Sequence, residues 1–149
     1  ITNRGHGDML SIGRQARREL YNLQPDAITP PVPAELCIET GGRIAADGEL
    51  LEPLTDEDLQ HLQQQLQQPK PDAVAINLLF SFIADTAEKA IEKIIPAGIF
   101  TSRSSEILPE YKEYERGITT WLNAWVGPPG QAYLQRRRYQ LPQTPIAGM

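Results

Sequence analysis

Apolar and polar positions recur along this chain with different periods, and each period predicts a secondary-structure element. Residues 73–83, AVAINLLFSFI, form a continuous apolar run, which predicts a strand buried on both faces. Leu59, Leu62 and Leu66 recur at i, i+3 and i+7 in a glutamine-rich stretch, so this stretch predicts a helix with one apolar stripe. The chain therefore mixes helical and extended patterns.

The apolar run belongs to a predicted βαβ unit. Residues 85–95, DTAEKAIEKII, have the composition of a helix capped by Asp85, and GIFTSRSS at 98–105 predicts another short strand. Strand, helix and strand in that order are typical of a parallel sheet with a right-handed connection.

Glycine dipeptides upstream predict β-hairpins. Within residues 35–54, Gly41-Gly42 and Asp47-Gly48 favour tight turns between three strands. Thr55 and Asp58 follow with the spacing of a capping box, which predicts the start of the next helix. The sheet is therefore expected to be mixed.

The two ends of the chain predict helices and a connector. GDMLSIGRQARRELY at 7–21 starts with Asp8 in the position of an N-cap and predicts one or two helical turns. The proline-rich residues 26–33 predict an extended connector, and a long helix is expected from Pro109 onwards. Residues 142–149, PQTPIAGM, have the character of a strand about to begin.

The predicted fold class is α/β, in a single domain over residues 1–149. It consists of a mixed sheet with a βαβ unit, β-hairpins and a long C-terminal helix that is broken at Pro128-Pro129. The chain length is that of one ordinary domain with a sizeable core.

Residues 113–125 carry two stripes on the predicted helix. The apolar stripe is interpreted as the side that faces the core: Tyr114, Ile118, Trp121, Leu122 and Trp125. The second stripe is purely polar, with spacings of i, i+3, i+7 and i+10: Glu113, Arg116, Thr120 and Asn123.

Two interpretations of the polar stripe remain open. In one, the stripe faces water and Gly117, on the same helix, relieves a close helix contact. In the other, the stripe and the neighbouring Thr119 face a groove, where a carboxylate and a guanidinium pair and the hydroxyl and amide groups bind a ligand or another backbone. Solvent-facing helix sides usually prefer Lys, Glu and Gln over Thr and Asn, which favours the groove.

A second polar cluster lies in IGRQARRELY. Arg14, Arg17 and Arg18, beside Gln15, have the donors to clamp a carboxylate or phosphate. Alternatively these are surface arginines that stabilise the negative end of a helix.

Composition excludes several functional classes. The net charge is −5 with acids concentrated in residues 26–68, so a nucleic-acid surface is not expected. No apolar run is long enough to span a bilayer, and the single cysteine, Cys37, fits a reducing compartment. We therefore expect a cytoplasmic protein with no membrane partner. His6 and His61 lack partners at metal-ligand spacing, so no metal site is expected.

Two long segments resemble one enzyme family. ITNRGHGDMLSIGRQARRELY resembles the TT-x-G-F-x-D and L-x-I-G-R-Q-x-R-x-x-L-Y run of the hydantoinase A and 5-oxoprolinase family. SSEILPEYKEYERGITTWLNAWVGPPGQAYL resembles its S-x-E-x-x-P-E-x-x-E-Y-E-R-x-x-T-T-x-x-N-A-Y segment, and the order of the intervening elements also fits. The resemblance covers nearly all of the chain.

The resemblance implies an ATP-dependent enzyme that opens a lactam or imide ring, such as 5-oxoproline or N-methylhydantoin. It also implies a divalent metal such as Mg²⁺ and a fold similar to the acetate kinase, hexokinase and actin (ribonuclease H-like) superfamily. The D-x-G-G-T phosphate hairpin of the family does not occur in this sequence. The chain is thus expected to be an internal fragment that needs the remainder of its own chain, binds no cofactor alone and is inactive alone.

The resemblance also gives the polar residues provisional roles. Glu113 and Arg116 are expected to hold the site as an ion pair, while Thr119, Thr120 and Asn123 are substrate-binding candidates together with the cluster at residues 14–17. Catalytic residues remain unassigned. The chain departs from the family at His6, Phe80 and Ala87, so the roles of the family histidines at the last two positions do not carry over.

Two other functional classes stay open. In the first, the family fold serves as a non-catalytic assembly module that binds a hydantoinase B-like subunit. RQARREL and QRRR alone suggest a nucleic-acid-binding domain, whose signature would be a steep loss of affinity with added salt.

Overall fold

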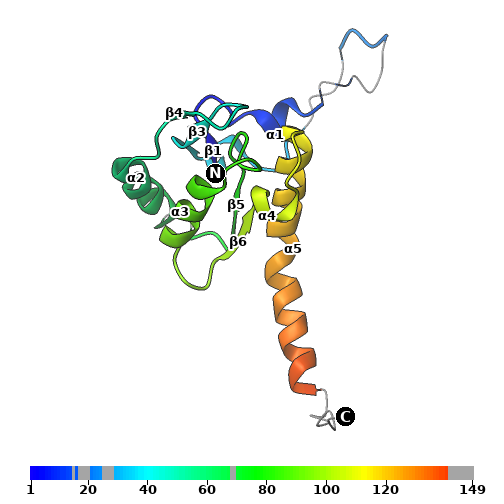
Figure 1. The fold of residues 1–149 in the computed structure, drawn as a ribbon. Helices are drawn as coiled ribbons and strands as arrows, with labels where there is room; N and C mark the ends of the chain where they lie inside the picture. Colours follow the sequence, from blue (N-terminus) through cyan, green and yellow to red (C-terminus); the bar gives the residue numbers. More distant parts are fainter. Residues whose placement is uncertain (15, 17–20, 25–28, 68–69, 141–149) are drawn as a thin grey trace, which may run out of the picture.

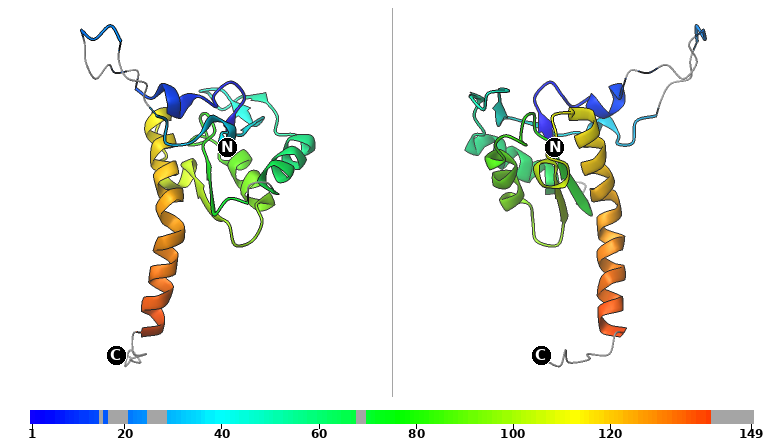
Figure 2. Two further views of the ribbon diagram at one scale, coloured as in Figure 1. Left: turned by 180° about the vertical axis from the view of Figure 1, so that it is seen from behind. Right: turned by 45° about the vertical axis from the view of Figure 1, so that its right-hand side comes forward.

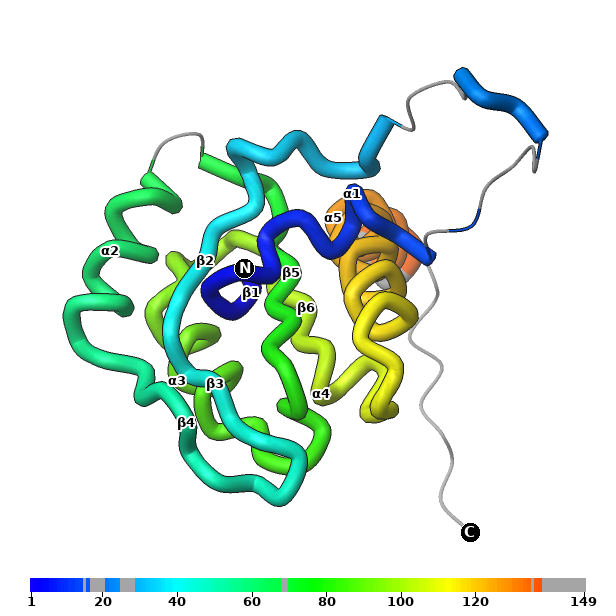
Figure 3. Tube along the Cα trace, turned by 90° about the horizontal axis from the view of Figure 1, so that it is seen from above, coloured from blue at the N-terminus to red at the C-terminus, as the bar shows by residue number. Residues whose placement is uncertain are grey.

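Four short parallel strands form the centre of the molecule. The computed structural model describes residues 1–14, 16, 21–24, 29–67 and 70–140 (Figure 1). The strands are β1 (Thr2–Asn3), β2 (Glu39–Thr40), β5 (Ala73–Ile76) and β6 (Phe100–Arg103). β1 pairs with β2 and β5 pairs with β6, and a parallel bridge between Thr2 and Asn77 joins the two pairs. The spatial order is therefore β2-β1-β5-β6, which Figure 3 shows from above.

Helices cover both faces of these strands. α2 (Asp56–Gln67) and α3 (Thr86–Ile94) lie on one face, and α5 (Glu113–Gln140) runs along the other, against β5 and β6 (Figures 1 and 2). The apolar core lies under α2 and α3: Leu62, Leu66, Val74, Ile76, Leu78 and Ile91. Along β5, the larger residues Val74 and Ile76 are buried in this core. Ala73 and Ala75 alternate with them, so the α5 face of the strand carries small side chains.

The remaining elements are short. They are α1 (Met9–Ile12), the 3-10 turn η1 (Ala34–Leu36), β3 (Arg43–Ile44), β4 (Leu50–Glu52) and α4 (Ser104–Ile107). In the described part of the chain, no helix has the length and apolarity needed to cross a lipid bilayer.

Several sequence predictions are confirmed. β5, α3 and β6 form the expected βαβ unit. At the start of α2, the Thr55 hydroxyl accepts from the Asp58 amide at 3.1 Å, and the Asp58 carboxylate accepts from the Thr55 amide at 3.0 Å. This is the reciprocal bonding of a capping box. The Asp47-Gly48 turn joins the antiparallel β3 and β4, with Gly48 at φ +88°.

The predicted hairpin at Gly41-Gly42 is wrong. β2 pairs with β1 rather than with β3, so its edge is already occupied when the chain turns. The Gly42 amide donates to the Glu52 carbonyl at 3.1 Å, and Gly42 has a φ of +88°. The glycine pair therefore takes the chain out of the parallel sheet and into the β3-β4 hairpin.

The strand predicted over residues 73–83 ends earlier, at Ile76. Beyond the bridge at Asn77 the backbone turns, with Phe80 at φ +55° and the Ile83 amide donating to the Phe80 carbonyl at 2.8 Å. The apolar run therefore contains both a strand and a turn, and within the turn Leu78 and Ser81 are buried. Asp85 precedes α3 as predicted, but its carboxylate pairs with Lys89 at 2.8 Å instead of capping the helix.

The predicted break of the C-terminal helix at Pro128-Pro129 is also wrong. α5 begins at Glu113, not at Pro109, and continues through both prolines. The fixed φ of proline is close to the helical value. Gly127 precedes Pro128, and a residue without Cβ avoids much of the clash between a proline ring and the preceding side chain. The expected connector (26–33) lies partly, and the expected C-terminal strand wholly, outside the described residues.

Candidate functional site

α5 packs against the sheet through its polar stripe, not through its aromatic one. Arg116 and Thr120 are buried, whereas Leu122 and Trp125 of the predicted core stripe are 43% and 67% exposed. The interpretation of the apolar stripe as core-facing is therefore wrong for Leu122 and Trp125, while Tyr114, Ile118 and Trp121 are half-buried. The alternative in which the polar stripe faces water is wrong for Arg116 and Thr120. The reason is steric, because the face that meets the strands carries the small residues.

Two glycines set the close approach of α5. A Cβ added at Gly117 would lie 2.2 Å from Met9 Cε and 2.9 Å from Asn77 Nδ2. A Cβ added at Gly127 would lie about 2.4 Å from the ring of Phe100. The close helix contact expected at Gly117 is confirmed, and large side chains at these positions would hold the helix away from the strands.

Arg116 is the centre of a buried polar network. Its Nη2 donates to Asn77 Oδ1 at 3.1 Å and to the hydroxyls of Ser81 and Ser104 at 3.0 Å each. It also donates to the Leu78 carbonyl. The guanidinium thus ties α5 to the end of β5, to the following turn and to the start of α4. Burial lowers its pKa, and the charges of Glu88 and Glu113 act in the opposite direction.

Glu88 of α3 completes this network from the other face of the sheet. Its side chain is fully buried. Oε1 accepts from the Leu78 amide at 3.0 Å and from the Ser104 hydroxyl at 2.6 Å. Oε2 accepts from the amide and the hydroxyl of Ser105 at 3.0 and 2.6 Å. The Ser104 hydroxyl therefore bridges a buried carboxylate and the buried guanidinium of Arg116.

These groups gather at the carboxyl ends of the parallel strands. Asn3 ends β1, Asn77 follows β5, and Ser104 follows β6. Asn3 Oδ1 accepts from the Leu79 amide at 2.7 Å, so the turn after β5 is fixed from β1 as well. In open α/β sheets, ligands bind outside this edge of the strands. The network is therefore a candidate support for a ligand site.

The other residues of the predicted stripe have different environments. Thr119 and Thr120 donate to the backbone carbonyls four residues earlier, and Asn123 donates to Ser102 Oγ of β6 at 2.9 Å. Glu113 Oε1 is buried without a hydrogen-bond partner among the described residues. The expected ion pair between Glu113 and Arg116 is absent from the described part of the chain, because Arg116 is directed to the strands.

The arginine cluster is only partly described. Arg14 is exposed and pairs with Glu115 of α5, with Nε 3.1 Å from Oε1, and its guanidinium lies over the ring of Tyr114. Gln15 and Arg17 lie outside the described residues. Arg14 is thus placed at the N-terminal end of α5, on the same side of the molecule as α1 (Figure 1).

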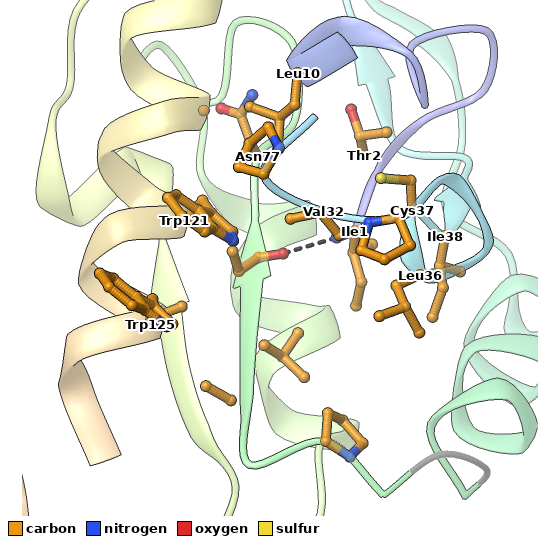
Figure 4. A pocket seen from close by; sticks show the side chains of 18 of the residues that line it. Ile1, Thr2, Leu10, Val32, Leu36, Cys37, Ile38, Asn77, Trp121 and Trp125 are labelled. Carbon is orange, nitrogen blue, oxygen red and sulfur yellow. Dashed lines mark hydrogen bonds between the residues drawn. The ribbon is translucent and has the colours of Figure 1, made fainter. Parts of the chain in front are cut away.

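A groove of about 970 Å³ lies between α5 and the β1-β5 part of the sheet. Trp121 stands on one side, and Thr2, Val32 and Cys37 stand on the other (Figure 4). Its polar groups include Asn77 and Thr2, and Thr2 Oγ1 has no hydrogen-bond partner among the described residues. Burial raises the pKa of the Cys37 thiol. In the described residues, no three or more His, Cys, Asp or Glu side chains gather as metal ligands.

Sequence reasoning missed Asn3, Asn77, Glu88 and Ser104. Asn77 carried a usable signal, because it is the first polar residue in the apolar run of residues 73–83. The other three lie at the ends of short strands or inside an ordinary amphipathic helix. No periodicity distinguishes them from surface residues.

Comparisons with known proteins place the chain in one group. Residues 1–98 match the family described as Hydantoinase/oxoprolinase N-terminal region. An uncharacterized protein of Methanocaldococcus jannaschii is 36% identical over 138 residues, which cover 91% of this chain and 20% of that protein. Caprolactamase subunit alpha of Pseudomonas jessenii is 29% identical over 139 residues, which cover 89% of this chain and 20% of that subunit. The acetophenone carboxylase gamma subunit of Aromatoleum aromaticum is 26% identical over 142 residues, which cover 85% of this chain and 19% of that subunit.

Two solved structures have the same fold. The ATP-dependent caprolactamase from Pseudomonas jessenii superposes with a TM-score of 0.76 at 28% identity, covering 92% of this chain and 20% of that one. Nucleotide-free acetone carboxylase superposes with a TM-score of 0.75 at 23% identity, covering 87% and 21%. The chain spans about a fifth of the length of these relatives.

Proposed function

Because this chain belongs to the hydantoinase/oxoprolinase N-terminal region family, we propose that it is part of an ATP-dependent enzyme that opens cyclic amide rings. The substrates are rings of the hydantoin (N-methylhydantoin) or 5-oxoproline class. The proposal is carried by one observation, the superposition on an ATP-dependent caprolactamase over 92% of the chain. ATP would activate the ring amide by phosphorylating its oxygen, so that water can attack the carbon.

The D-x-G-G-T phosphate hairpin of the family does not occur in this sequence. We therefore propose that ATP and Mg²⁺ bind to other parts of the whole protein, which we expect to have an acetate kinase, hexokinase and actin-like fold. Residues 1–149 would be one internal domain of it, inactive alone and located in the cytoplasm.

The buried network defines the role we propose for the polar stripe. Arg116 is a positioning residue, because all of its described side-chain hydrogen bonds go to groups that hold the carboxyl edge of the strands. Asn123 contributes by fixing α5 on β6 through Ser102, whereas Thr119 and Thr120 bond the backbone of α5 itself. Glu113, whose buried Oε1 lacks a described partner, remains a candidate for direct substrate contact.

Arg14, Gln15 and Arg17 remain candidates for recognising a substrate carboxylate or ring carbonyl. The exposure of Arg14 leaves its guanidinium accessible.

The decisive assay is ATP consumption by the full-length protein, purified with any subunit encoded beside it. We expect phosphate release with 5-oxoproline, hydantoin, N-methylhydantoin or caprolactam, and none with open-chain secondary amides. Silence across the whole ring panel would contradict the proposal. Consumption only with ketones and bicarbonate would instead assign the protein to carboxylation.

A second candidate function, an assembly module for a hydantoinase B-like subunit, is supported by the exposed apolar face of α5. Leu122, Trp125 and Val126 are 43%, 67% and 52% exposed, which is typical of a surface that another polypeptide covers. Two of the relatives are named as enzyme subunits. Co-purification of such a subunit with the full-length protein, lost in Trp125→Ser and without ATP turnover, would favour this alternative.

A further inference from the structure

Two polar groups lie side by side on the sheet wall of the groove. Thr2 and Asn77 are partners in the parallel bridge between β1 and β5, so their side chains stand on the same face, roughly 4.8 Å apart in the pairing direction. Both side chains are more than nine-tenths buried, and both line the groove. A groove whose other walls are mainly apolar therefore has two polar groups at one place.

Arg116 fixes the orientation of the Asn77 amide. A guanidinium can only donate hydrogen bonds, so the atom 3.1 Å from Arg116 Nη2 must be the amide oxygen of Asn77. The Asn77 nitrogen then faces the other way, where its described partner is the thioether of Met9 at 3.5 Å. Sulfur is a weak acceptor, so the amide keeps donor capacity toward the groove.

The Thr2 hydroxyl lacks even a weak partner. Its Oγ1 is buried and makes no hydrogen bond to any described residue. A buried hydroxyl without a partner is costly, and such atoms are rare in folded proteins. The matched atom is Thr40 Oγ1, which is also buried and unpartnered but belongs to a residue that does not line the groove.

A donor beside a hydroxyl on one wall matches a specific ligand geometry. In a ring amide the C=O and N–H bonds point to the same side, because the ring forces the cis form. In an open-chain secondary amide they point to opposite sides, because the trans form is preferred. Only the cis edge can accept from Asn77 and donate to Thr2 at the same time.

We propose that Asn77 and Thr2 bind the cis-amide edge of a small neutral ring, with the Asn77 N–H donating to its carbonyl and the Thr2 hydroxyl accepting from its N–H. The ring then lies against Met9, Leu10 and Trp121, which also line the groove. Leu10 and Trp121 lie near Asn77 in Figure 4. The choice of ligand rests on the proposed function, because a ring amide is the substrate class proposed there. The groove would be the place where that ring amide is held. Arg116 acts indirectly, by keeping the donor of Asn77 turned to the ligand.

The experiment compares Thr2→Val with Thr40→Val in the full-length protein. Both variants remove a buried hydroxyl without a described partner and keep the shape of the side chain, so neither should lower the melting temperature. Caprolactam affinity is measured by calorimetry, and N-methylacetamide serves as the open-chain probe. We expect Thr2→Val to weaken caprolactam binding by about five- to tenfold and Thr40→Val to leave it unchanged.

Alkylation of Cys37 locates the ligand independently of turnover. Cys37 lines the groove beside Thr2, so bound caprolactam should slow its reaction with N-ethylmaleimide, followed by mass spectrometry of the Cys37 peptide. Protection that disappears in Thr2→Val but persists in Thr40→Val would support the site.

The outcomes separate this site from the proposed function. ATP consumption with ring amides, combined with equal caprolactam affinity in wild type and Thr2→Val, would overturn the site and leave the function standing. Protection of Cys37 by caprolactam without any ring-dependent ATP consumption would support the site and contradict the function. Equal binding of caprolactam and N-methylacetamide would overturn the cis-amide argument.

Discussion

Replacing Arg116 by methionine should loosen the carboxyl edge of the sheet more than any surface change. The substitution keeps most of the apolar length of the side chain but removes the donor shared by Asn77, Leu78, Ser81 and Ser104. The Asn77 and Leu78 oxygens are then buried without this donor, which destabilises the folded state by about 1–3 kcal/mol for each oxygen. Glu88 also loses its nearby positive charge. Packing of the methionine side chain offsets part of this cost. We therefore expect the free energy of opening this region to fall by about 4 kcal/mol in total.

Hydrogen exchange of the full-length protein measures this loss locally. Peptides that cover residues 77–84 and 103–108 should exchange about a thousandfold faster in Arg116→Met, since each 1.4 kcal/mol corresponds to a factor of ten. Arg14→Met is the matched control, because Arg14 is 67% exposed and its pair with Glu115 should contribute less than about 1 kcal/mol. Exchange within tenfold of wild type in Arg116→Met would refute the reasoning.

The remaining predictions concern the packing of α5 and the cap of α2. Gly127→Ala should destabilise the protein, because the new Cβ would meet the rigid Phe100 ring. Gly130→Ala has open space around the new Cβ and should stabilise α5 by up to ~1 kcal/mol. Melting temperatures that change in the same direction in the two variants would contradict this. For Asp58, partial burial acts to raise the pKa, but the hydrogen bonds from Thr55 and the ion pair with Arg4 hold it below the ordinary value of 3.8. Its contribution to stability is therefore present above pH 3.8 and lost as the pH falls through the lowered pKa. Asp58→Asn should remove this acid-dependent step from exchange of the α2 peptide, and an unchanged pH profile would argue against it.

The sequence could predict much of the fold because local physical rules act there without competition. The capping box at Thr55 and Asp58, the apolar stripe of α2 and the βαβ unit all follow from short-range spacing, and the structure has them. The family could likewise be recognised, because long collinear segments resemble it and the match over residues 1–98 agrees. The hairpin at Gly41-Gly42 could not be predicted, because the partner of β2 lies more than thirty residues earlier in the chain.

The candidate site could be predicted only as a set of residue types. Arg116 was identified from its position in a polar stripe, but its partners at the end of β5, in the following turn and at the start of α4 lie 12 to 39 positions away in the sequence. Glu88 was not identified, since a glutamate inside an amphipathic helix usually faces water. Tertiary packing made it a buried acceptor of four hydrogen bonds.

The sequence by itself determined the βαβ unit, the capped start of α2 and which family the chain resembles, because capping, periodicity and motif spacing are local properties. Tertiary structure decided which side of α5 is buried. Periodicity marks the aromatic side as the more apolar one, yet the glycines at 117 and 127 and the small residues of β5 and β6 allow the closest approach on the polar side. Shape complementarity between distant segments thus outweighed hydrophobicity, and it brought Arg116, Glu88 and Asn77 together.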